Sequence, residues 1–177
     1  MRALKGWHDI LVLGTSNPIS MENFPQYRVI SGLSTLIKTH TKRLKHYKAA
    51  AVRAKNTPLK MLFKKYEAHS QDSIKTLVAW LVNYGGPSYF PMETREINSL
   101  WNKIGNIFYP GEINELLTKS EAIERYALRI HRKALALSVV PPDTTEDIQN
   151  QIKNCEEAFA TIKMLREKGV NELMVAY

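Results

Sequence analysis

Residues 31–66, which read SGLSTLIKTHTKRLKHYKAAAVRAKNTPLKMLFKKY, decide the fold of this chain. Apolar side chains recur here three or four positions apart, the spacing of an α-helix, and they share one face with a histidine: Leu33, Leu36, Ile37, His40, Leu44, Tyr47, Ala51 and Ala54. This pattern predicts a helix over 31–55. A second helix follows at once, with Thr57 as its predicted N-cap and Pro58 as its first residue. Because the turn between them is so short, the two helices are expected to pack antiparallel.

The rest of the chain predicts a second helical hairpin. Gly85-Gly86-Pro87 ends the second helix, because glycine adopts the left-handed cap and proline cannot continue a helix. A long connection over 85–112 is expected to hold a short helix that places apolar residues on its inner side: Ile97, Leu100, Trp101, Ile104 and Phe108. The third helix is predicted over 113–138. The fourth begins after Pro141-Pro142, with Thr144 or Thr145 as its N-cap, and ends at Gly169.

Two antiparallel pairs joined by a long crossover make an all-α, antiparallel four-helix bundle. We predict that this bundle spans residues 29–169, between a flexible N-terminal extension over 1–28 and a C-terminal tail over 170–177. Both Met1 and Met21 are candidates for the start of the protein. No apolar run approaches the length of about 18 residues that crosses a bilayer. The single cysteine excludes an internal disulfide and is typical of a reducing compartment. We therefore expect a cytoplasmic protein without a membrane partner.

The stretch from Asn23 to Tyr66 carries eleven Lys or Arg and no Asp or Glu, in a chain of net charge +8. Several like charges on one surface attract an anionic partner. The predicted anion-binding residues share an arc of the first helix: Lys38, Lys42, Lys45 and Arg53. Phosphate groups or an acidic protein surface would suit this arc, although no motif for reading a base sequence accompanies it. The alternative interpretation is a solvated lysine face.

Several short motifs resemble a known family. They are HYKAA at 46–50, PLK at 58–60, LF at 62–63, the glycine pair at 85–86 and Trp101, followed by a second group: Leu116-Leu117, Glu121, Glu124, Leu128, His131 and Ala134-Leu135. Together, over about residues 33–166, they resemble the PA2169-like family of bacterial proteins, a domain of unknown function. The resemblance implies a ferritin-like bundle that forms homo-oligomers. The chain departs from the family pattern at Lys42, His46, Thr76 and His131, where the family favours an acid, a glycine, a Glu and a Tyr.

Metal chemistry depends on the residues that face the predicted core. A ferritin-like di-iron site uses carboxylates from all four helices and two Glu-x-x-His motifs. This chain has no such motif and its first helix has no acid, which argues against iron oxidation. A sparser set, predicted to face inward, could hold zinc or iron: His40, Glu124, His131 and Cys155. Alternatively, the histidines are hydrogen-bonded core residues, Cys155 is a small buried hydrophobe and one histidine partners Glu124, because an isolated buried carboxylate is costly.

We therefore predict a ferritin-like four-helix bundle with a non-catalytic structural or interaction role, no cofactor, and a second copy of itself as partner. One alternative is a metal-binding bundle that holds a divalent ion at the inward His, Glu and Cys residues. The other is a nonspecific anion or nucleic-acid binder that uses the basic first helix.

Overall fold

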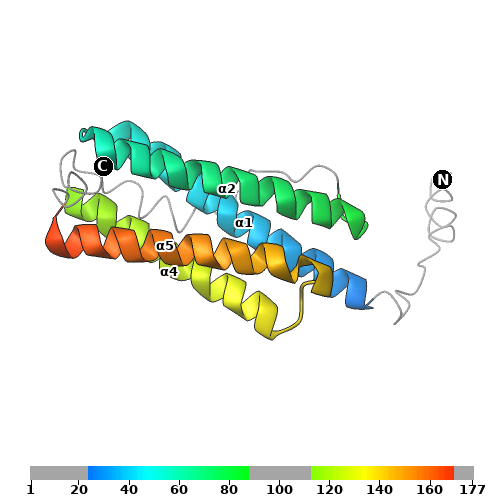
Figure 1. Cartoon of the computed structure of the whole chain (residues 1–177). Coiled ribbons are helices and arrows are strands. Elements are labelled where there is room, and N and C mark those ends of the chain that lie inside the picture. Colours follow the sequence, from blue (N-terminus) through cyan, green and yellow to red (C-terminus); the bar gives the residue numbers. More distant parts are fainter. Residues whose placement is uncertain (1–23, 88–112, 170–177) are drawn as a thin grey trace, which may run out of the picture.

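The computed structural model describes residues 24–87 and 113–169, and the long elements in these ranges are four helices. They are α1 (Phe24–Arg53), α2 (Thr57–Asn83), α4 (Ile113–Ala136) and α5 (Thr145–Lys168), with the short 3₁₀ helix η2 (Pro142–Thr144) before α5. Figure 1 shows α1 paired with α2 and α4 paired with α5. The predicted all-α four-helix packing is confirmed. The short helix predicted in the connection and the C-terminal tail lie outside the described residues.

Each long helix packs mainly against two others, and contacts across the bundle give their directions. α1 packs against α2 and α4, and α5 packs against α4 and α2. His46 meets Ser120 and Arg28 meets Leu137, so α1 and α4 are antiparallel. Equivalent contacts, Lys65 with Glu157 and Trp80 with Asp147, make α2 and α5 antiparallel. Consequently α1 and α4 form one face of the bundle, and α2 and α5 form the opposite face.

The buried core has an apolar cluster at each end. One cluster includes Tyr47, Phe63 and Leu117, near the turn between α1 and α2. The other includes Leu36, Leu81 and Ile148, toward the opposite end. Burial of these side chains is the main force that holds the helices together. A layer of polar side chains lies between the two clusters, and it forms the candidate site below.

α1 begins earlier than the sequence predicted, because residues 24–28 of the expected extension belong to the helix. Proline is tolerated at position 25, because backbone N–H groups in the first turn of a helix have no acceptor within the helix. The Gln26 amide donates a hydrogen bond of 3.0 Å to the Tyr84 carbonyl. Arg28 donates one of 3.4 Å to the Leu137 carbonyl. These bonds connect the first turn of α1 to the ends of α2 and α4. The spacing of apolar residues along the chain does not reveal such long-range contacts.

The predicted caps were only partly right. The N-cap of α2 is Asn56, whose side chain accepts a hydrogen bond from the Leu59 N–H at 3.0 Å, so Thr57 is already helical. Thr144 does occupy the N-cap position of α5, but its hydroxyl donates to the Pro141 carbonyl and does not cap the helix.

The ends of α2 and α4 share one capping motif but differ in the residue that adopts the left-handed conformation. After α2 this residue is Gly85, with φ of 76°, and after α4 it is Ser138, with φ of 49°. At both ends the N–H groups of this residue and of the next one donate to carbonyls of the last turn. A side chain makes this conformation costly by about 1 kcal/mol.

We therefore expect Ser138→Gly to raise the free energy of unfolding by about 0.5–1 kcal/mol and Gly85→Ser to lower it by about 1 kcal/mol or more. Urea denaturation measures both changes. A Ser138→Gly protein no more stable than the native one would contradict the prediction.

Candidate functional site

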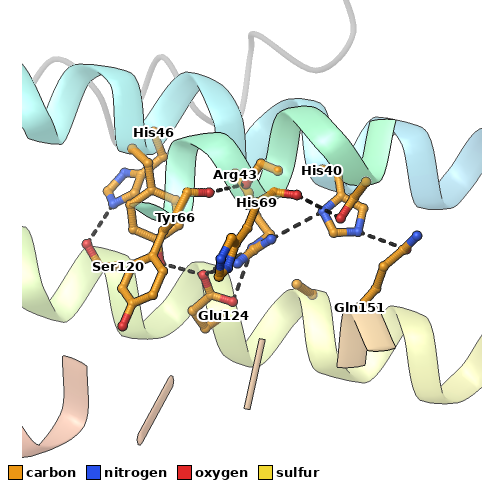
Figure 2. A network of polar contacts seen from close by, with 12 residues as sticks. His40, Arg43, His46, Tyr66, His69, Ser120, Glu124 and Gln151 are labelled. Carbon is orange, nitrogen blue, oxygen red and sulfur yellow. Dashed lines mark hydrogen bonds and ion pairs between the residues drawn. The ribbon is translucent and has the colours of Figure 1, made fainter. Parts of the chain in front are cut away.

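A chain of hydrogen bonds crosses the middle of the bundle between the two apolar clusters (Figure 2). Its members are buried and come from three helices: His40, Arg43 and Tyr47 of α1, Glu124 and His131 of α4, and Gln151 of α5. Buried polar groups of this kind are costly unless each finds a partner.

An ion pair between Arg43 and Glu124 forms the centre of this layer. Only 1% of the arginine side chain and none of the glutamate is exposed. Arg43 Nε donates to both carboxylate oxygens at 3.0 and 3.1 Å, and Nη2 donates to Oε1 at 2.9 Å. The Tyr47 hydroxyl donates to the same oxygen. Burial works against the charged guanidinium, but the Glu124 carboxylate outweighs it and the pKa of Arg43 lies above its ordinary value.

The two histidines extend this chain, and their neighbours fix where each proton sits. A guanidinium can only donate, so His40 Nδ1 accepts from Arg43 Nη1 at 3.2 Å. A carbonyl can only accept, so His131 Nδ1 donates to the Ala127 oxygen at 2.8 Å. His40 Nε2 therefore carries the proton that points to His131 Nε2 at 2.9 Å and to the Gln151 oxygen at 3.1 Å. Both rings are neutral in this arrangement.

A proton added to either histidine would place two donors against each other. It would meet Arg43 at His40 Nδ1, or the His40 N–H at His131 Nε2. Burial is the first cause that lowers the pKa of His40, followed by the electrostatic effects of a proton on His131 and of the Arg43 guanidinium. Burial also lowers the pKa of His131 to about 4. The hydrogen-bond geometry and the pKa shifts thus agree that the layer holds neutral imidazoles.

The Tyr47 hydroxyl and the Cys155 thiol keep their protons near neutral pH. Burial, and then the charge of Glu124, raises the pKa of Tyr47 well above 10. Burial likewise raises the pKa of Cys155 to about 12, so its thiol stays protonated near neutral pH. A protonated thiol is a poor nucleophile and a poor metal ligand. These groups therefore suit a structural role better than covalent chemistry.

The structure brings some of the predicted metal ligands together and separates others. His40 and His131 are in direct contact, but Glu124 is occupied by Arg43 and Tyr47. Within 24–87 and 113–169, no group of three His, Cys, Asp or Glu side chains is placed to hold a metal ion. The expectation that a histidine partners Glu124 is wrong, because Arg43 does so. The metal site itself stays a prediction, which metal analysis of protein purified without a histidine tag decides.

Arg43 is the residue that sequence reasoning missed. It is one of the eleven basic residues between Asn23 and Tyr66, yet it is almost fully buried. Its position gave a usable signal: it follows Leu36 by seven residues and His40 by three, and it precedes Tyr47 by four. These are the spacings of one helix face. A cation on that face indicates a buried acid elsewhere, and Glu124 is that acid.

The predicted anion-binding residues lie on the outside of α1. Lys38, Lys45 and Arg53 are exposed, and Lys42 is partly exposed. The Lys42 ammonium lies 5.0 Å from the ring centre of Tyr126 in α4. Arg129 of α4 approaches the same ring at 5.5 Å. Basic residues of α4 therefore continue the basic surface of α1.

Charge is divided unequally between the two faces of the bundle. α1 and α4 together contain twelve Lys or Arg and three Glu. α2 and α5 contain eight Lys or Arg and seven Asp or Glu. Two of the three acids on the α1 and α4 side, Glu121 and Glu124, are buried and paired with arginines. We call the outer surface of α1 and α4 the basic face.

Among the described residues, none of the helices is long and apolar enough to span a bilayer. Comparison of the chain with models of known protein families, with curated proteins and with solved structures gave no match.

Proposed function

We propose that this chain is a non-catalytic, ferritin-like helical bundle whose basic face binds the phosphate backbone of nucleic acid. The observation that carries the proposal is the excess of cationic residues on α1 and α4 over the nearly neutral α2 and α5. A ferritin-like connectivity is supported by the two antiparallel hairpins and by the parallel directions of α2 and α4. A non-catalytic role is supported by the polar layer, whose buried groups are committed to one another.

The shape of the basic face suits a linear polyanion. α1 has 30 residues, and a helix of that size is about 45 Å long. Its exposed basic side chains lie between Arg28 and Arg53, with the lysines in the middle of the helix, and Arg129 and Lys133 add charge from α4. Nucleic acid presents closely spaced phosphates over such a distance, and each neutralised phosphate adds salt-dependent affinity without sequence preference. Tyr126, which lies beside Lys42 and Arg129, is a partly exposed aromatic ring on which an unpaired base can stack.

Two variants of equal net charge test whether this face or the overall charge is responsible. The first reverses three residues of the basic face, Lys38→Glu, Lys42→Glu and Arg129→Glu. The matched control reverses three exposed lysines of α2 and α5: Lys64→Glu, Lys75→Glu and Lys153→Glu. Fluorescence anisotropy measures binding to duplex DNA and to single-stranded RNA at about 50 mM and about 200 mM salt.

We expect the basic-face variant to lose at least about tenfold in affinity at low salt. The slope of log affinity against log salt concentration should become shallower by the equivalent of about two to three phosphate contacts. The control variant should keep most of its binding. Equal losses in both variants would show that net charge alone is responsible. Failure of the native protein to bind either nucleic acid at about 50 mM salt would reject the proposal.

A further inference from the structure

A groove of about 310 Å³ opens between the first half of α1 and the end of α4. Its lining combines two kinds of side chain. Tyr27, Ile130 and Leu137 supply apolar surface, while Arg28 and Lys133 supply positive charge. This volume lies at the lower end of the range for small-molecule sites, which are mostly apolar with a few polar groups.

Gly32 explains how the chain can pack so closely beside this groove. A Cβ atom at this position would lie 2.3 Å from the Val139 carbonyl oxygen, closer than such atoms approach. The segment after α4 therefore crosses α1 where only glycine fits. Two large apolar side chains that line the groove stay open to solvent, Tyr27 with 70% and Leu137 with 50% of their surface exposed. Exposed apolar side chains gathered around a hollow commonly mark a binding surface.

The charged lining residues are basic. The Arg28 guanidinium donates one hydrogen bond, of 3.4 Å, to the Leu137 carbonyl, which uses one of its five N–H donors. Lys133 is exposed on the facing helix. Among the described residues that line the groove there is no Asp or Glu. An apolar hollow with two cations along it matches a molecule that has an apolar body and one anionic head.

We propose that this groove binds a free amphipathic carboxylate, a fatty acid of medium chain length. The carboxylate faces Arg28 and Lys133, and the hydrocarbon chain lies over Tyr27, Ile130 and Leu137. Each methylene removed from water contributes about 0.8 kcal/mol, which is about a fourfold gain in affinity. The groove shares Lys133 with the basic face, but its lining includes none of Lys38, Lys42 and Arg129, so the two proposals can be tested separately.

Isothermal titration calorimetry with octanoate, decanoate and dodecanoate, each below its micelle concentration, tests the proposal. Affinity should rise about tenfold or more for each pair of added methylenes until the groove is filled. Decanol, which has the same chain without the charge, should bind at least about tenfold more weakly than decanoate. Equal affinities for decanol and decanoate, or binding only to vesicles of anionic lipid, would overturn the proposal.

Variants locate the binding site. Ser31→Phe fills the groove from an exposed position, and Lys133→Glu reverses the charge beside it. We expect each to weaken decanoate binding by at least about tenfold, and the Lys133 variant to leave decanol binding nearly unchanged. Lys153→Glu on α5 is the matched control. Unchanged binding by the Ser31 variant, or equal losses in both lysine variants, would place the ligand elsewhere.

The variant that reverses Lys38, Lys42 and Arg129 separates the two proposals. It removes the proposed nucleic-acid contacts but leaves the groove lining intact. We expect it to bind decanoate within about twofold of the native protein, because separated surface charges are screened by salt. A tenfold loss of decanoate binding in this variant would reject the groove as an independent site.

Discussion

Arg43→Met is expected to lower the free energy of unfolding by about 3–5 kcal/mol. The substitution removes the guanidinium but leaves the Glu124 carboxylate fully buried, with Tyr47 as its remaining donor from α1. It also removes the donor to His40 Nδ1. A domain of ordinary stability has only about 5–15 kcal/mol in total, so the variant should be close to unfolding at room temperature. Urea denaturation followed by circular dichroism measures the change.

The double variant Arg43→Met with Glu124→Leu separates electrostatics from packing. Replacing both members of a buried ion pair by apolar residues is often neutral or stabilising. The double variant should therefore recover part of the lost stability, while the Tyr47 hydroxyl and His40 Nδ1, which lose these partners, keep it below the native protein. Lys65→Met is the matched single control, because the Lys65–Glu157 pair joins α2 to α5 at the exposed surface. It should cost less than about 1 kcal/mol. If the double variant were as unstable as Arg43→Met alone, the loss of stability would come from lost packing and not from the unpaired Glu124 charge.

Much of the fold could be predicted from the sequence because helices depend on local signals. The apolar spacing between Leu33 and Ala54 and the glycines at 85–86 were enough to place α1, α2 and the turn between them. Cap residues were harder, because Asn56 and Thr57 are both good caps and only the hydrogen bond to the Leu59 N–H distinguishes them. The earlier start of α1 depends on contacts with Tyr84 and Leu137, far away in the sequence.

The candidate site could be predicted only in part, because its partners come from different helices. His40, Glu124, His131 and Cys155 were correctly expected to be buried. Their arrangement depends on how far each helix is rotated and shifted against its neighbours, which a single sequence does not state. Periodicity placed Lys42 outside, but it could not show that Tyr126 and Arg129 of α4 lie beside it. The basic face is therefore a tertiary feature, although half of it was visible as a run of basic residues.

Mild acid is expected to destabilise the protein well before its carboxylates are protonated. The ordinary histidine pKa is 6.5, whereas burial lowers the pKa of both His131 and His46 to about 4 in the folded state. Between these values the unfolded chain binds more protons than the folded protein, so the free energy of unfolding falls as pH falls. The contribution of these neutral histidines to the free energy of unfolding is complete above about pH 6.5. By pH 5, protonation in the unfolded chain lowers the free energy of unfolding by about 2 kcal/mol for each of them. His40, whose pKa is lowered in the same direction, adds to the loss.

His46→Gln tests the cause of this acid sensitivity. The His46 ring bonds to the Ser120 hydroxyl at 2.7 Å, and that hydroxyl donates to the Leu116 carbonyl, so His46 is the donor. Glutamine can replace that donor but cannot take up a proton. Urea denaturation at pH 7, 6 and 5 should therefore show a fall in stability that is about 2 kcal/mol smaller than in the native protein. His69→Gln, at a partly exposed position of α2, is the control and should change the fall less. A His46→Gln protein that loses stability as steeply as the native one would show that another group takes up the proton.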